Sequence, residues 1–247
     1  MSAFVAVLRR ELFGLWVTPL AWVVLCVFLA LQGVSFYLLI AHFSQVTSTA
    51  LGQDPIQAYF ASLFVPISLL LVCPALTMRV LAEERKSGTI EALLTAPVTP
   101  LAVVLAKYLA VLITYALLWL PTLLYVVIVQ SIGEVDWPVV GASYLGVLGV
   151  GGAYLAIGTL MSALSKNQIA AHLMTTFVLF GLFIVGVGER VLDPGFLREL
   201  CAHVSVLSQL EELSQGVVQL SRLVFDASVI ALCLFLAQRV VRSWRWG

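Results

Sequence analysis

Charged side chains are scarce in this chain of 247 residues, where Asp, Glu, Lys and Arg together make up only 11%. Soluble domains are usually about a quarter charged and about half apolar. Here 62% of the residues are hydrophobic and the mean hydropathy is +1.07. A soluble core cannot hide such an excess of apolar surface. The composition therefore excludes an ordinary soluble domain and predicts a polytopic membrane protein.

Reactive groups are equally sparse. The chain has four cysteines, of which only Cys201 lies in a polar segment, so no disulfide framework is expected and the cysteine spacing fits no metal site. No Ser/His pair, paired carboxylates or His/Cys cluster stands out, and the motif G-x-x-x-x-G-K-[ST] is absent. We therefore expect no catalytic residues, no metal and no ATP held by this chain, which would not itself be an enzyme.

Long apolar runs are what the chain does have. Six of them approach the roughly 20 residues that a membrane-spanning helix needs. The predicted fold is all-α, a single transmembrane domain over residues 1–247. The predicted spans cover residues 19–42, 59–78, 108–129, 139–163, 169–187 and 223–238.

Proline positions refine these helices. Thr18-Pro19, Asp54-Pro55 and Thr99-Pro100 each combine a capping residue with proline at the first helical position, so each pair predicts a helix start. Proline inside a helix removes a hydrogen bond and bends it. Kinks are therefore predicted at Pro66, Pro74 and Pro121.

The basic residues predict the orientation, because Lys and Arg concentrate on the cytoplasmic side of membrane proteins. The termini and the loops after spans 2 and 4 hold most of them: Arg9, Arg10, Arg79, Arg85, Lys86, Lys107, Lys166, Arg239, Arg242 and Arg245. The remaining three are Arg190, Arg198 and Arg222. Both termini are predicted to be cytoplasmic. Trp244 and Trp246, beside Arg242 and Arg245, are interpreted as an interfacial anchor.

The external segment 188–221 has a helical apolar pattern. Its apolar residues Phe196, Leu197, Leu200, Val204 and Leu207 recur at helical spacing and predict a short amphipathic helix on the outer membrane face, with Glu211 and Glu212 toward water. Such a helix either lids the bundle or gates a substrate. Arg222 and Asp226 stand four residues apart, which predicts a local ion pair.

Small residues mark one face of span 4. They recur at spacings of three and four, so another helix can approach closely there. The residues are Ala142, Gly146, Gly149, Ala153 and Ala156. This face is either an ordinary packing face within the chain or a seam between subunits.

The segment 81–100 gathers charges that topology alone does not require. The helix of span 2 is expected to run on to about Lys86, and Ser87-Gly88 to break it. A second short helix over residues 89–95 is predicted to start at Ser87 and to end before Pro97. Acidic, basic and apolar groups together at one membrane surface are typical of a site that binds a protein partner.

Several stretches of the sequence resemble those of a known family of membrane proteins. The stretch "EERKSGTIEALLTAPVT" resembles the hallmark segment of ABC-2 type transporter permeases, which lies between their second and third spans. "TPLAW", "LAKYLA" and "SKNQIA" are similar to the gliding-motility-associated subfamily. The six-span order and the predicted orientation agree with that family.

The resemblance implies a half-transporter that works as a dimer in the inner (cytoplasmic) membrane, with each half docked on a separate P-loop ATPase that binds ATP and Mg²⁺. It implies an amphipathic elbow helix before span 1. The same helix is predicted by apolar residues at helical spacing beside Arg9 and Arg10, namely Phe4, Val5, Leu8, Leu12, Leu15 and Trp16. It further implies a membrane partner with an external domain, and no nucleic acid.

The family's coupling helix, which contacts the ATPase, is carried over by resemblance to the charged segment. The implied contact residues are Glu83, Glu84, Arg85, Lys86, Gly88, Thr89, Ile90, Glu91 and Leu94. A second implied contact is the turn formed by Ser165, Lys166, Asn167 and Gln168.

Two other classes of function remain open. An ATP-independent carrier or channel needs ionisable or polar groups along the spans, and the predicted spans carry almost none. A structural scaffold for a motility or surface complex makes no such demand. Export is expected from the resemblance, and the substrate has no signature in the sequence.

Overall fold

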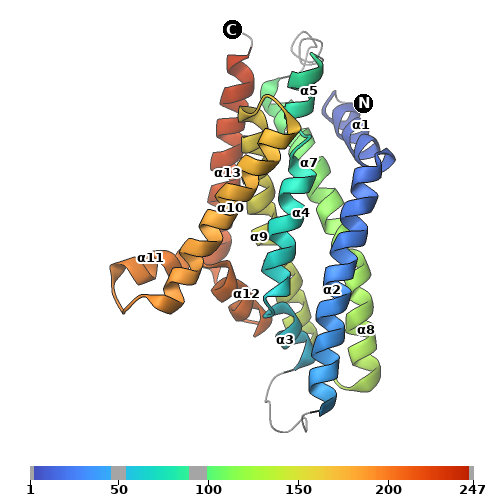
Figure 1. Cartoon of the computed structure of the whole chain (residues 1–247), viewed down its shortest axis with the longest axis vertical. Coiled ribbons are helices and arrows are strands. Elements are labelled where there is room, and N and C mark those ends of the chain that lie inside the picture. The colour runs from blue at the N-terminus through green and yellow to red at the C-terminus, as the bar shows by residue number, and fades with distance from the viewer. Residues whose placement is uncertain (1–2, 46–53, 89–98, 245–247) are drawn as a thin grey trace.

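The computed structural model describes residues 3–45, 54–88 and 99–244, and within these ranges all regular structure is helical. Six helices are long and apolar enough to cross a membrane, as predicted, and they pack into one elongated bundle (Figure 1). The candidate spans are Pro19–Ser44, Phe64–Lys86, Pro100–Ile132, Trp137–Leu164, Gln168–Val191 and Leu220–Ser243.

The individual helices follow the proline signals. Pro19, Pro55 and Pro100 each begin a helix, and the Thr99 hydroxyl accepts a bond from the Ala102 N–H at 3.3 Å. The helices are α1 (Ala3–Val17), α2 (Pro19–Gln45), α3 (Pro55–Phe60), α4 (Phe64–Thr77), α5 (Ala82–Ser87), α7 (Pro100–Trp119), η2 (Leu120–Thr122), α8 (Leu123–Ile132), α9 (Trp137–Leu164), α10 (Gln168–Val191), α11 (Phe196–Val204), α12 (Val206–Ser214) and α13 (Leu220–Ser243).

Spans 2 and 3 are less regular than predicted. Pro121 lies in the 3₁₀ turn η2 between α7 and α8, which confirms an interruption there. Pro66 falls in the first turn of α4, where no helical hydrogen bond is lost. Span 2 does run on to Lys86, but not as the continuous helix that was expected, because a turn at residues 78–81 separates α4 from α5.

Helix α9 lies at the centre of the bundle and packs against α4, α7, α10, α12 and α13. Of its small residues, Ala142, Gly146, Ala153 and Ala156 are buried and Gly149 is partly buried. Gly146 lies against Leu213 of α12 and Gly149 against Asp226 of α13. Helices of the same chain therefore cover this face at those two glycines.

A buried polar contact joins α2 to α3 and α4 in the apolar interior. The Gln32 side chain donates to the Ser68 hydroxyl at 2.9 Å and accepts from the Tyr59 hydroxyl at 3.0 Å. All three side chains are buried. Since an unpaired amide in such surroundings is costly, this pairing fixes how α2 lies on its neighbours.

The segment after α10 differs from the single surface helix that was predicted. It forms two helices separated at Ser205, with α12 packed on α3 and α9 while α11 projects from the side of the bundle (Figure 1). Leu207 is buried in α12, whereas Phe196 and Leu197 on α11 are exposed. The apolar residues thus do not share one face, because the chain turns between them.

The ion pairs of this segment also differ from those expected. Arg222 pairs with Glu212 at 2.7 Å instead of with Asp226, whose carboxylate accepts from Gln209 at 2.7 Å. Glu211 pairs with Arg190. Both glutamates that were predicted to face water are therefore tied to arginines of the same chain.

The two ends of the bundle are unlike. The described ends of the chain, α1 and α5 gather at one end, and α3, α11 and α12 lie toward the other (Figure 1). The described part of the predicted partner-binding segment thus shares an end with α1, the predicted elbow helix, and with the described end of α13. We call this the α5 end.

The close approach of α4 to α9 generates a prediction. A Cβ at Gly158 would lie 2.2 Å from Oγ1 and 2.8 Å from Cβ of Thr77. Gly158→Ala should therefore lower the free energy of unfolding by about 1–3 kcal/mol, because the packed helices must separate. Unfolding in mixed detergent–SDS micelles measures this. Gly181→Ala is the matched control, since nothing lies within 4 Å of that Cβ position; equal stability of the two variants would contradict the packing.

Candidate functional site

The charged helix α5 is short and sharply bounded. It contains Glu83, Glu84, Arg85 and Lys86 and ends before Gly88, whose φ of 71° lies in the left-handed region that favours glycine. The predicted break at Ser87-Gly88 is confirmed. The second predicted helix, with Thr89, Ile90, Glu91 and Leu94, lies outside the described residues.

The start of α5 is fixed by a side chain from α9. The Ser162 hydroxyl accepts from the backbone N–H groups of Leu81 and Ala82, each at 3.1 Å. Ser162, Leu81 and Ala82 are all buried. Without this oxygen two buried donors would lose their acceptor, so the hydroxyl acts as an N-terminal cap supplied by another helix.

A buried ammonium group joins α5 to two further helices. Lys107 Nζ of α7 lies 3.0 Å from Oε1 of Glu84 and 3.0 Å from Oε2 of Glu11 on α1. Its side chain is only 3% exposed. Arg10 Nη2 lies 2.9 Å from Glu11 and 3.2 Å from Glu84. We call Arg10, Glu11, Glu84 and Lys107 the charge network.

The charge network balances two cations against two carboxylates. An ammonium group withdrawn from water is stable only when it is paired and hydrogen-bonded, and the two carboxylates meet that need. The hydrogen bond from Arg10 to Glu11, aided by the charges of both carboxylates, raises the pKa of Arg10 further above its usual value. Arg10 therefore remains cationic at any physiological pH.

Two more contacts hold α5 in place. Arg79, in the turn before α5, donates to both carboxylate oxygens of Glu83 at 2.7 and 2.8 Å. The Arg85 guanidinium lies over the ring of Trp244, the residue directly after α13, at 5.3 Å from the ring centroid. Trp244 therefore does more than anchor the chain at an interface. Trp246 lies outside the described residues.

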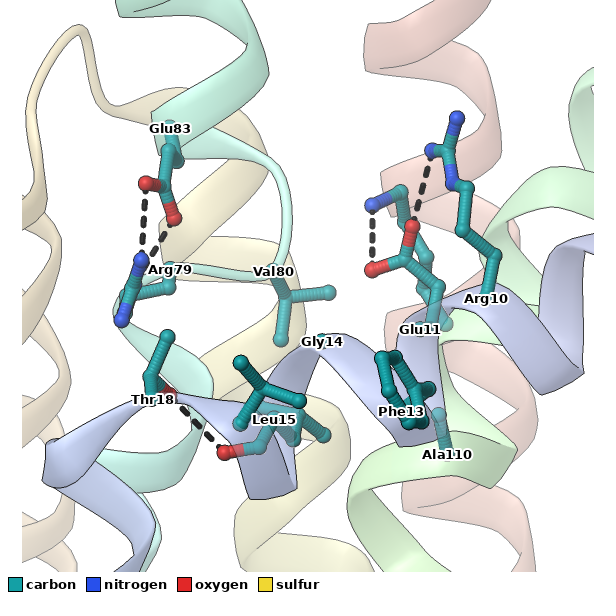
Figure 2. A pocket seen from close by; sticks show the side chains of 12 residues that line it. Arg10, Glu11, Phe13, Gly14, Leu15, Thr18, Arg79, Val80, Glu83 and Ala110 are labelled. Atoms are coloured by element: carbon teal, nitrogen blue, oxygen red, sulfur yellow. Dashed lines mark hydrogen bonds and ion pairs between the residues drawn. The ribbon is translucent and has the colours of Figure 1, made fainter.

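A cavity of about 420 Å³ separates α1 from the turn before α5 (Figure 2). Its lining includes Arg10, Glu11, Arg79, Glu83 and Lys107 beside apolar groups of α1. Charges of both signs face this space, and within the described residues no three His, Cys, Asp or Glu side chains could hold a metal ion together. The charged residues of this cavity therefore connect α1, α5 and α7 to one another.

The second predicted contact lies near α5 but is only partly exposed. Ser165 is buried and donates to the Met161 carbonyl at 2.8 Å. The Asn167 side chain caps α10 by accepting from the Ala170 N–H at 2.7 Å. Lys166 is exposed, and α5 packs on both α9 and α10, the helices that this turn joins.

The charge network was not predicted from the sequence. Lys107 was counted as a loop residue, whereas it lies in the second turn of α7 and is buried. The signal was present in the sequence, because Thr99-Pro100 already predicted a helix start that places Lys107 inside an apolar helix. No local pattern, however, indicates that Glu11 and Glu84 meet there.

A family model described as ABC-2 family transporter protein matches residues 41–201, more than half of the chain. The chain belongs to the ABC-2 transporter family. It is thus a multi-pass membrane component of an ABC transporter, a kind of protein that works with an ABC ATPase. The match includes Glu84, Lys107 and Ser162, whereas α1 precedes it. No curated protein matches the chain, and the gliding-motility subfamily stays a prediction.

The pairing of Lys107 with Glu84 can be measured directly. Lys107→Met should lower the free energy of unfolding by about 2–3 kcal/mol, because it removes the buried cation that lies between two largely buried carboxylates. Glu84→Gln should then lower the free energy of unfolding by less in the Lys107→Met background than in the wild type. Additive effects would contradict a direct pair. Lys166→Met removes an exposed ammonium at the other connection near α5 and should change stability by less than about 0.5 kcal/mol.

The cap on α5 gives a second prediction. Ser162→Ala removes the shared acceptor, which should speed hydrogen exchange at the Leu81 and Ala82 amides by roughly tenfold, matching a lost cap of about 1 kcal/mol. Exchange in α9 should change little. Ser131→Ala is a suitable control because its hydroxyl donates only to the Ile128 carbonyl in its own helix. Unchanged exchange at residues 81 and 82 would show that Ser162 does not hold α5.

Proposed function

We propose that this chain is the permease half of an ABC-2 transporter in which α5 receives force from a separate ATPase and passes it to the membrane helices. The observation that carries this proposal is the attachment of α5 to three helices that reach into the membrane. Ser162 joins it to α9, Lys107 to α7 and Trp244 to α13. A displacement of α5 would move the ends of these helices with it.

This proposal divides the residues of α5 between two roles. Glu83, Glu84 and Arg85 contact their own chain and would transmit the movement. Lys86 is exposed and would meet the ATPase together with Thr89, Ile90, Glu91 and Leu94. Lys166 would add a second contact from the turn between α9 and α10.

The rest of the mechanism follows from this division. ATP and Mg²⁺ would bind to the partner, whose closure would rock two permease halves between two arrangements and so drive export or conformational work. The concentration of Lys and Arg at the α5 end favours a cytoplasmic position for that end, in the inner membrane. A partner with an external domain, as in gliding-motility systems, would approach from the end opposite to α5.

A second copy of the chain would complete the transporter. An apolar groove of about 430 Å³ lies between α2, α4 and α10, with Val27, Leu71 and Leu173 among its lining residues. The outward faces of α2 and α10 carry further exposed apolar side chains, including Trp22 and Phe177. We expect the second copy to pack along this groove.

Affinity purification of the tagged protein in mild detergent from its native cells, followed by mass spectrometry, tests the proposal. A stoichiometric P-loop ATPase is expected in the complex. Nucleotide-independent transport by the pure chain in vesicles would instead support a carrier. An assembled complex without an ATPase, with no change in any exported compound on deletion, would support a scaffold.

The two roles within α5 predict different outcomes for charge reversal. Lys86→Glu combined with Glu91→Lys should weaken binding of the ATPase roughly tenfold, because contact charges would now repel, while the melting temperature stays unchanged. Glu84→Lys should lower the melting temperature, because it places a third cation beside Lys107 and Arg10. Arg198→Glu, an exposed position on α11, controls for a change of charge alone. Loss of stability in the Lys86/Glu91 variant would refute the division.

A further inference from the structure

A second groove lies beneath the elbow helix, on the side facing α7. Its volume is about 780 Å³, and its lining includes Phe13 and Trp16 of α1 and Ile113 and Leu117 of α7. All the lining side chains are apolar or aromatic except those of Arg9 and Arg10. The groove therefore combines an apolar body with two guanidinium groups.

The apolar body of this groove continues into the membrane-facing surface of the protein. Ile113 and Leu117 belong to the third span and remain partly exposed in the bundle, and Phe13 of α1 is 72% exposed. Exposed apolar groups on a spanning helix are covered by acyl chains in a bilayer. An acyl chain can thus lie along α7 and reach the underside of α1.

The polar part of the groove consists of two arginines, of which only Arg10 is paired with carboxylates among the described residues. Arg9 is exposed and makes no ion pair with any residue that the structure describes. Arg10 contributes to this groove and also contacts Glu11 and Glu84. No Asp or Glu lines the groove, unlike the cavity of Figure 2, which contains Glu11 and Glu83. The charge here is complementary to an anion.

We propose that one anionic phospholipid binds in this groove, with its phosphate at Arg9 and Arg10 and an acyl chain along Ile113 and Leu117. Guanidinium groups pair with phosphate oxygens in a fixed geometry, and basic clusters at the end of a spanning helix attract anionic lipid. Because Arg10 also contacts Glu84, the lipid headgroup would share a ligand with the attachment of α5. This site does not depend on the proposed transport function.

Native mass spectrometry of the full chain in detergent tests the site. After delipidation, the protein is titrated with phosphatidylglycerol or with phosphatidylcholine of the same acyl chains. The wild type should retain one phosphatidylglycerol molecule in preference to phosphatidylcholine. Arg9→Gln should weaken that binding roughly fivefold, the effect of one basic residue near an anionic membrane surface, and Arg9→Lys should largely preserve it.

Two controls distinguish lipid binding in this groove from unspecific attraction of anionic lipid to basic residues. Arg242→Gln removes an exposed arginine from α13 at the α5 end of the bundle and should leave binding unchanged. Ala6→Phe fills the groove without changing its charge and should weaken retention of the lipid. Glycerol phosphate should not compete, because it lacks the acyl chain.

The proposal is overturned by equal retention of the two lipids, by equal binding in the Arg9→Gln and Arg242→Gln variants, or by effective competition from glycerol phosphate. The last result would mean that a soluble anion, not a lipid, occupies the basic rim. Melting temperatures of the variants confirm that each one is folded before its lipid binding is compared.

Discussion

The ion pairs of the Lys107 ammonium group hold the helices at the α5 end together. It lies within 3.0 Å of carboxylates from two helices that are far apart in the sequence, and water scarcely reaches it. A buried cation of this kind is stable only while both helices remain in place. The positions of α1, of α5 and of the first turns of α7 therefore depend on one another.

This constraint explains how a helix as short as α5 keeps a fixed position. Six residues cannot form a stable helix alone, so contacts with neighbouring helices must stabilise α5. Ser162 caps its start, Glu84 is held by Lys107, and Arg85 lies over Trp244. The turn at residues 78–81 separates it from α4, so α5 is held by contacts with neighbouring helices and is not a continuous extension of α4. Force applied to α5 in an ABC-2 protein would then enter several spans at once.

Much of this fold was predictable, because membrane constraints act locally. Apolar length gave six spans, and proline gave the starts of α2, α3 and α7. What could not be predicted are pairings between distant residues. Counting basic residues treats Lys107 as a loop charge, and nothing near Glu84 in the sequence indicates Glu11 as its neighbour. The ion pair of Arg222 is another example. Arg222 pairs with Glu212 of α12 and not with Asp226, and the residue pattern of α13 alone does not indicate that α12 lies close to it.

The most direct test of the central claim is a distance measurement between α1 and α5 in the complex with the ATPase. Spin labels on cysteines that replace Phe13 and Glu83, introduced after replacement of the four native cysteines, report this distance by pulsed electron resonance with and without ATP; the Glu83 side chain is 42% exposed and lies outside the charge network. One unchanged distance distribution is expected in both states, and a nucleotide-dependent shift is expected once Lys107→Met breaks the charge network. A shift in the wild type, or identical behaviour of the Lys107→Met variant, would contradict the claim that α1 and α5 move as one unit.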